Sequence, residues 1–455
     1  MTSPASRQKR RGQLGVALLM VIAFITLMSL VLIEFSRSAQ THFKSGVNLR
    51  DEMRATTMAD TAVTLTQACL DPSAWESLRS FQENLDLEQL CRIMLNLFVK
   101  NRVDLPIGGL SFEMNNIQGL GLFKGEVDIQ MKTEESYIGL AGLHCAGRGS
   151  TGSNCPSRRS TARKLRAILC DPKLEALFES EQEDGKEYTR DDIIGNLVDW
   201  IDADDNRISY DPLTNQFTEG AGEGEDSYYR DILDGEGYRS KDAPFDSIQE
   251  LRLVKGINEQ LYDHLKGKVS VHSSGKVDVN FATPQVLATL LRAESPWFQA
   301  AETQGNACGR ESDTLEQVEQ LLNYYVRLIV DARDSRKASA PLSKPFRGKN
   351  GVSQFIQVVK DPLGQLVTSA QRMAGGLIQI TAQDVLARYN MTEQDYLALQ
   401  TEFARYADNL KDSVTTESKL LRLQAEGKVG NISRRVFAVL KRDGKAVRTL
   451  YYREE

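Results

Sequence analysis

The chain of 455 residues has little of what most catalytic and metal sites require. It contains only four histidines, and the patterns GxxxxGK[ST], HExxH, GxSxG and CxxC do not occur in it. These absences disfavour a His-rich metal centre, a phosphate-binding loop, a zinc ribbon and a redox dithiol. One GxGxxG pattern, 147–152, lies between two cysteines and not between a strand and a helix, so we interpret it as accidental. We therefore do not expect an enzyme.

The chain also lacks an excess of positive charge. Lys and Arg total 56 against 62 for Asp and Glu, which gives a net charge of -6. Neutralising nucleic-acid phosphates requires a basic face, so no nucleic-acid partner is expected. The 41% hydrophobic and 26% charged residues are ordinary for a globular protein of about two to four domains. The exception is the first fifteen residues, which carry four basic side chains and no acid.

Long apolar runs are scarce, and one stands out. Residues 16–33 contain no charge and directly follow the basic leader. A helix of about 20 residues spans the ~30 Å hydrocarbon core, and basic flanks stay on the cytoplasmic side. The sequence therefore predicts a single-pass inner-membrane protein with a cytoplasmic N-terminus and a periplasmic body. The alternative, a cleaved secretory signal, usually has a shorter apolar region of about 7–15 residues.

The border between leader and apolar run is distinctive. The stretch Arg10-Arg11-Gly12-Gln13-Leu14-Gly15 followed by Val16-Ala17-Leu18-Leu19 resembles a type IV prepilin leader. The resemblance implies cleavage by a prepilin peptidase after Gly15 and N-methylation of Val16; Gly12 is the weaker alternative. Most pilin-like proteins carry Glu at the fifth mature position, where it pairs with the N-terminus of a neighbouring subunit. Here that position is Met20, which is also compatible with an ordinary lipid-facing residue.

Downstream patterns predict an α+β fold. No proline occurs between Pro4 and Pro72, and apolar residues recur at helical spacing as far as Cys69, which predicts a long spine helix. Alternating patterns predict strands at 110–114, 125–131, 421–427, 435–440 and 447–452, with a tight turn at Asp443-Gly444. We expect a small antiparallel sheet on the spine helix, with a mostly helical insertion that includes helices at 162–178 and 190–201. The predicted divisions are 1–15 (leader), 16–70 (spine), 71–139 (first part of the α/β domain), 140–414 (insertion) and 415–455 (last strands).

Six cysteines are compatible with disulfides in an oxidising compartment. Cys145 and Cys155 flank a Gly/Ser-rich loop, and we predict that they pair. The other four remain open, because six cysteines allow 15 connectivities. Buried free thiols are the simplest interpretation of Cys69 and Cys170.

Two acidic clusters are the richest candidate for chemistry. Residues 196–206 end a predicted helix in four aspartates, and residues 222–229 hold Glu223, Glu225 and Asp226. Several adjacent carboxylates repel one another unless a cation lies among them, and hard oxygen ligands suit Ca²⁺. Asp202-x-Asp204-x-Asn206 imitates the start of an EF-hand loop, but Arg207 occupies the sixth position, where Gly is expected. A solvated acidic loop is the alternative.

One further motif lies downstream of the acidic clusters. Residues 244–257 combine a helix with a glycine turn, as in helix-hairpin-helix units, although an acidic setting favours a structural or protein-binding role.

Together with the leader and Met20, three motifs resemble the K-type minor pseudopilins of the bacterial type II secretion system. These are Trp200-Ile201-Asp202-Ala203-Asp204 with Glu225-Asp226-Ser227-Tyr228-Tyr229, Phe245-Asp246-Ser247-Ile248-Gln249-Glu250-Leu251-Arg252, and Val279-Asn280-Phe281-Ala282-Thr283.

The resemblance implies a pilin-like α/β body with a large inserted helical domain. It also implies bound calcium, with Asp202, Asp204, Glu225 and Asp226 as ligands and Asp205 as an addition. The implied role is at the tip of a periplasmic pseudopilus, initiating or limiting its assembly for export of folded proteins across the outer membrane. The implied partners are I-type and J-type minor pseudopilins and the major pseudopilin. The alternative is a minor pilin of a type IV or DNA-uptake pilus.

Overall fold

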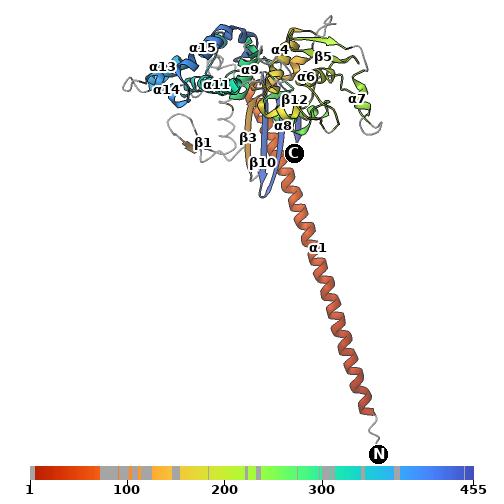
Figure 1. The fold of residues 1–455 in the computed structure, drawn as a ribbon. Coiled ribbons are helices and arrows are strands. Elements are labelled where there is room, and N and C mark those ends of the chain that lie inside the picture. The colour runs from red at the N-terminus through yellow and green to blue at the C-terminus, as the bar shows by residue number, and fades with distance from the viewer. Residues whose placement is uncertain are drawn as a thin grey trace, which may run out of the picture.

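The computed structural model describes most of the chain. The described residues are 6–71, 91, 102–104, 111–113, 125–145, 154–182, 184–220, 224–231, 237–273, 275–296, 298–299, 308, 313–339, 344–373, 380–444 and 446–455. They form a long rod with a broad body at its far end (Figure 1). The expected α+β architecture, a long N-terminal helix with a small antiparallel sheet and a mostly helical body, is confirmed.

The rod is helix α1 (Ser6–Leu70), and it matches the predicted spine helix. Its apolar segment from Val16 onward is long enough to cross a membrane, and the body buries none of it. Toward its C-terminal end the helix changes character, because Ala55, Met58, Ala59 and Ala62 are almost fully buried against the sheet. These mostly small side chains allow the helix axis to lie close to the strands.

The sheet has four antiparallel strands in the order β12-β11-β10-β3. Its strands are β3 (Glu126–Thr133), β10 (Leu420–Val429), β11 (Ile432–Asp443) and β12 (Ala446–Glu454). Alternate residues such as Leu423 and Ala425 face α1, as period-two patterning requires. A Cβ on Gly427 would lie 2.1 Å from the backbone oxygen of Ala55, so this glycine permits the contact between β10 and α1. The predicted turn at Asp443-Gly444 is present, with Gly444 at φ +49°.

One predicted strand lies elsewhere. Residues 110–114 were expected to join this sheet, but β2 (Ser111–Glu113) pairs with β1 (Arg102–Asp104) in a separate two-stranded sheet. The alternating pattern identified the strand and not its partner, because pairing depends on contacts distant in sequence.

The segment between β3 and β10 forms the second hydrophobic core, which extends from Ile138 to Val414. Its N-terminal half contains η3 (Glu134–Ser136), β4 (Ile138–Gly139), η4 (Leu140–Leu143), α4 (Pro156–Leu169), η5 (Pro172–Leu174), α5 (Glu175–Phe178), α6 (Arg190–Asp199), β5 (Ile208–Asp211), β6 (Gln216–Glu219), α7 (Asp226–Asp231), η6 (Ile248–Leu253), α8 (Glu259–Leu265), β7 (Val269–Ser270), β8 (Val277–Asp278) and α9 (Pro284–Glu294). The remainder contains α11 (Asp313–Ser339), α12 (Gly351–Lys360), α13 (Pro362–Met373), α14 (Ala382–Arg388), α15 (Glu393–Tyr406), η7 (Ala407–Asp412) and β9 (Val414–Thr415).

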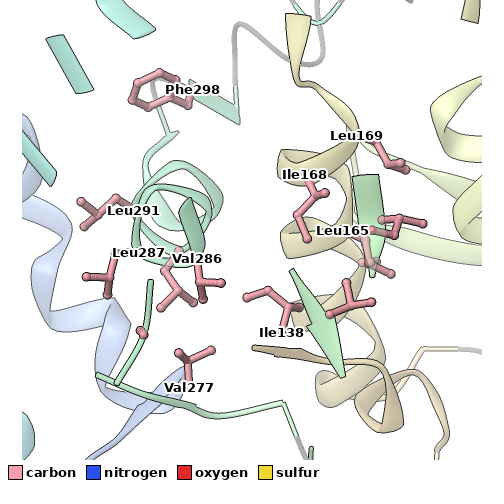
Figure 2. Packing of buried hydrophobic residues seen from close by; sticks show 14 of the residues in the cluster. Ile138, Leu165, Ile168, Leu169, Val277, Val286, Leu287, Leu291 and Phe298 are labelled. Atoms are coloured by element: carbon pink, nitrogen blue, oxygen red, sulfur yellow. The ribbon is translucent and has the colours of Figure 1, made fainter. Parts of the chain in front are cut away.

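Helices α4 and α9 pack at the centre of this core. Figure 2 shows Leu165 and Ile168 on α4 and Leu287 on α9, with Ile138 lying between the two helices in this view. The prediction of one continuous helix over 162–178 was wrong. The helix ends at Leu169, and a short 3-10 turn begins at Pro172, since a proline ring cannot continue a helix interior.

Three disulfides join the six cysteines. The structure pairs Cys145 with Cys155, the pair that the sequence predicted. It also pairs Cys69 with Cys91 and Cys170 with Cys308, so the interpretation of Cys69 and Cys170 as free thiols was wrong. The sequence could not identify these pairs, because the partners lie 22 and 138 residues apart.

Two buried glutamates fix the junction between sheet and helical segment. The Glu134 carboxylate accepts hydrogen bonds from Arg422 Nε at 2.5 Å and from the Ser270 hydroxyl. Glu135 accepts from the backbone N–H groups of Lys419 at 2.6 Å and Leu420 at 3.2 Å. The chain leaves the sheet after β3 and returns to it before β10. The short turn η3, which contains both glutamates, therefore holds both of these points.

Candidate metal centre

Helix α6 and the β5–β6 hairpin position the first acidic side chain. The helix begins with a capping box in which Thr189 and Asp192 exchange hydrogen bonds. A Cβ on Gly195 would lie 2.6 Å from the backbone oxygen of Ile208, so this glycine lets α6 approach β5 closely. Asp199, the last residue of α6, accepts a hydrogen bond at 2.8 Å from the N–H of Ile208 through Oδ1. Its side chain is thereby held against the start of the hairpin.

Three carboxylates from two loops converge beside this point. One oxygen from each of Asp199, Asp202 and Glu225 lies within 4.8 Å of the others. Asp202 Oδ1 and Glu225 Oε2 are buried and have no hydrogen-bond partner among the described residues. The nearest cation to Asp202 is Arg158, whose Nη2 lies 3.7 Å from Oδ2. The group therefore holds more buried negative charge than the surrounding donors neutralise.

The pKa values of these groups reflect this crowding. Burial, together with the charge of Asp202, raises the pKa of Asp199 to about 7. Burial and the neighbouring Asp204 raise the pKa of Asp202 to about 7, although Arg158 opposes the shift. Burial and the charges of Asp199 and Asp202 raise the pKa of Glu225 to about 9. A bound cation would stabilise the ionised carboxylates and so oppose all three shifts.

The group fits a hard divalent cation. Calcium binds oxygen ligands at about 2.3–2.6 Å, so two ligands on opposite sides of one ion lie up to about 5 Å apart. The 4.8 Å spread of Asp199, Asp202 and Glu225 is within that limit. Two orphaned carboxylate oxygens supply lone pairs that no other described residue uses. Carboxylate chemistry of this kind favours Ca²⁺ or Mg²⁺ over metals that prefer nitrogen or sulfur.

The other candidate ligands lie around this group. Asp204 is exposed and accepts a hydrogen bond from the N–H of Asn206 at 3.0 Å. Asp205 is also exposed, and its backbone oxygen accepts from the N–H of Glu225 at 3.4 Å, which connects the two acidic loops. Asp226 is buried and accepts from the N–H of Ser240 at 3.0 Å. The structure therefore brings Asp202 and Glu225 together and places Asp204, Asp205 and Asp226 outside the three-carboxylate group.

A second group of oxygens surrounds Ser240. Its hydroxyl lies within hydrogen-bond distance of Glu225 Oε1 at 3.1 Å, Asp226 Oδ1 at 2.9 Å and Asp242 Oδ1 at 2.9 Å. A serine hydroxyl has one proton to donate, so it cannot satisfy three carboxylates at once. Glu225 thus belongs to both groups through its two oxygens.

Sequence reasoning missed Asp199 and Asp242. Asp199 was visible as the first aspartate of the 196–206 cluster, and its position directly before Trp200 and Ile201, both buried here, was the available signal. Asp242 gave no comparable signal, because it lies outside both acidic clusters and has the left-handed φ of +51°. The candidate processing residues Gly15 and Val16 are consecutive residues of α1, and cleavage between them stays a prediction.

Comparison with known proteins relates the chain to one family and to a solved structure. Residues 160–274 match the family described as "Type II secretion system (T2SS), protein K". The chain is also similar to a chain of "The Crystal Structure of the GspK-GspI-GspJ complex from enterotoxigenic Escherichia coli Type 2 Secretion System", with 16% identity and a TM-score of 0.37. That alignment covers 73% of this chain and 80% of the other. A search of the curated proteins found no match. The family match contains both carboxylate groups, and it confirms the resemblance that the sequence motifs indicated, to the K-type minor pseudopilins of the type II secretion system.

Proposed function

We propose that this protein is a minor pseudopilin at the tip of the type II secretion pseudopilus, where it initiates or limits assembly for export of folded proteins. The observation that carries the proposal is the combination of a pilin-like rod with a wide body at one end (Figure 1). The apolar segment contains no acid before Glu34, so it offers no carboxylate to a neighbour's N-terminus. A subunit of this shape suits the end of a filament better than its interior.

The proposed partners are the I-type and J-type minor pseudopilins, with the major pseudopilin below them. Support comes from α1 between the apolar segment and the body. There Phe43, Leu49 and Met53 are 74%, 60% and 65% exposed, so their apolar surface is free to contact another protein. Similar helices packing side by side would cover them. The helix is processed in this proposal by a prepilin peptidase, which leaves methylated Val16 as the first residue.

We also propose that calcium occupies the candidate metal centre. Asp199, Asp202 and Glu225 would hold the ion, with Asp204, Asp205 and Asp226 as the nearby acids that the family resemblance favours. The ion would neutralise the buried carboxylates and fix the loop after α6 to the loop before α7. Its role would be structural, since it holds two acidic loops in one arrangement.

Two measurements test the assembly role. Mass analysis of the mature N-terminus is expected to give methylated Val16, and an intact Met1 would contradict the proposal. A photocrosslinking residue at Leu49 is expected to capture other pseudopilins in cells, whereas one at Leu213, which is exposed on the body, serves as the control. Equal capture at both positions would show that α1 is not the assembly surface.

The tip position has its own test. The substitution Met20→Glu places an acid where interior subunits carry one. We expect the variant to spread along the filament, whereas the unmodified protein stays at one end, as seen by labelling isolated pseudopili. An unmodified protein already distributed along the filament would refute the tip assignment.

A further inference from the structure

A cavity of about 270 Å³ lies on the outer face of the four-stranded sheet, which is the face turned away from α1. Because Leu423 and Ala425 point toward α1, the alternate residues Arg422 and Gln424 point into the cavity. Its wall comes from the start of η6 and from residues 271–272. Ligand pockets usually measure about 300–1,000 Å³, so this one suits a ligand of a single ring.

The register of the strands determines what forms the floor of the cavity. One row of opposed residues crosses all four strands, and it consists of Gln130, Gln424, Phe437 and Arg453. Opposed side chains lie about 4.5–5.5 Å apart at Cβ, so the Phe437 ring has the Gln424 amide directly beside it. Phe437 is half-buried and belongs to neither hydrophobic core. The floor therefore presents one aromatic ring next to two amides.

The charges in the lining largely compensate one another. Arg422 pairs with Glu134, with Nε 2.5 Å from Oε1, and Arg453 pairs with Glu455. The lysine of the lining, Lys132, is exposed to solvent. The cavity therefore holds no buried charge that requires a charged ligand.

Several uncharged polar groups of the lining are unused. Among the described residues, none forms a hydrogen bond with the Gln424 amide, the Tyr451 hydroxyl or the His272 ring. Tyr451 and His272 are neighbours, with ring centres 6.0 Å apart. Burial lowers the pKa of His272, so its imidazole is neutral at pH 7. An amide and a neutral imidazole each offer a donor and an acceptor, which suits a ligand that carries hydroxyl groups.

We propose that this cavity binds one neutral sugar ring of a glycan, with the ring resting on Phe437 and its hydroxyls on Gln130 and Gln424. The C–H bonds on the face of a sugar ring are attracted by the negative face of an aromatic ring. An aliphatic ligand would leave the amides without partners, and an anion would compete with Glu134 for Arg422. The site does not depend on the assembly role or on the calcium centre, since it shares no residue with either.

The first test uses the full chain in a detergent without sugar head groups, because such head groups would compete for the cavity. The probes are the trisaccharides of N-acetylglucosamine and of glucose, and their dissociation constants are measured by saturation-transfer NMR. Phe437→Leu keeps an apolar side chain and removes the flat ring, so we expect about tenfold weaker binding. The control is Gln216→Leu at an exposed position of β6, which should bind as the unmodified protein does. Equal affinities of Phe437→Leu and the unmodified protein would overturn the proposal.

A second variant tests the amides separately from the ring. Gln424→Leu has nearly the same size as the original side chain and removes its donor and acceptor. We expect about fivefold weaker sugar binding, with an unchanged midpoint of chemical denaturation. A lower midpoint together with unchanged sugar affinity would assign Gln424 to the stability of the fold and overturn its role in the site.

The nature and source of the sugar are identified by comparing ligands. Glucuronic acid is expected to bind no more tightly than glucose, and tighter binding would overturn the assignment of a neutral ligand. Tighter binding of the N-acetylglucosamine trisaccharide supports a cell-wall glycan, whereas equal or tighter binding of the glucose trisaccharide supports a hexose glycan. Binding of neither trisaccharide refutes the sugar site. The crosslinking and mass measurements do not involve this cavity, so the proposed function and the sugar site can fail separately.

Discussion

Glu225 offers a direct test of how charge is balanced in the candidate metal centre. Its pKa is raised to about 9, and those of Asp199 and Asp202 to about 7, whereas unfolded carboxyls titrate near 4. Between those pH values the folded state holds more protons than the unfolded state. The free energy of unfolding therefore falls as pH rises from about 4 to 9 when no metal is present. Glu225→Gln removes one of the three charges and should weaken this dependence.

The size of this effect on the free energy of unfolding follows from the smallest of the three pKa shifts. A shift of about three units, as for Asp199, corresponds to about 4 kcal/mol for an isolated group. The three groups share one mutual repulsion, so their contributions do not add. We allow for the part of Asp202 that remains solvated. With calcium removed by a chelator, we expect the unmodified protein to be about 2 kcal/mol less stable than Glu225→Gln at pH 9. At pH 5, where the group is largely protonated, the two should have similar stability.

The assay is chemical denaturation of the full chain in detergent at pH 5, 7 and 9, followed by tryptophan fluorescence, with chelator or with excess calcium. Calcium at about a hundred times its dissociation constant should stabilise the unmodified protein by about 2.7 kcal/mol and the variant by less. The difference in stability at pH 9 between the two proteins therefore narrows when calcium is added. Asp211→Asn serves as the control, because that exposed carboxyl has its pKa lowered by the Thr214 hydroxyl and the N–H of Leu213. If the free energy of unfolding, measured with chelator, changes with pH equally in the unmodified protein and in Glu225→Gln, the reasoning is refuted.

Three other substitutions test the fold by the same denaturation assay. Gly427→Ala should destabilise the protein by about 2–4 kcal/mol, because its Cβ would meet helix backbone at 2.1 Å, whereas Gly46→Ala, with nothing within 4 Å, should raise stability by up to ~1 kcal/mol. Equal effects at the two glycines would contradict the close helix–sheet contact. Glu134→Gln should cost about 2 kcal/mol, because it removes the charge of a buried carboxylate that bonds to the half-buried Arg422, and a change below about 0.5 kcal/mol would argue against the junction. Replacing Cys170 and Cys308 with serine should lower the free energy of unfolding by about 3–5 kcal/mol, since their disulfide closes a loop of 138 residues. If neither the substitution nor chemical reduction changes the stability, that disulfide is excluded.

Much of the fold was predictable because its signals are local. The absence of proline between Pro4 and Pro72 predicted the length of α1, and alternating side chains predicted β3, β10, β11 and β12 within a few residues. The break after Leu169 was missed, although Pro172 was visible, because the apolar spacing on both sides continues at a helical period. The partner of β2 and two of the disulfides depend on contacts between distant residues, which periodicity does not contain.

The candidate metal centre shows the same division. Asp202 and Glu225 were identified from clustered acids and the family resemblance, and the structure brings them together. Asp199 belongs to the 196–206 acidic cluster but was not among the ligands that the family resemblance implied. Its burial depends on Gly195 and the approach of β5, which composition does not reveal.

The bare length of α1 has a mechanical consequence. From Ile33, the end of the apolar run, to Ala55, where the body first buries the helix, there are 22 residues, or about 33 Å at ~1.5 Å per residue. The body therefore stands off from the bilayer surface by roughly the thickness of the hydrocarbon core itself. A small tilt of the anchor within the lipid is magnified along this lever arm into a large sideways sweep of the body. In the proposed assembly, subunits that pack along α1 would hold the body on the filament axis.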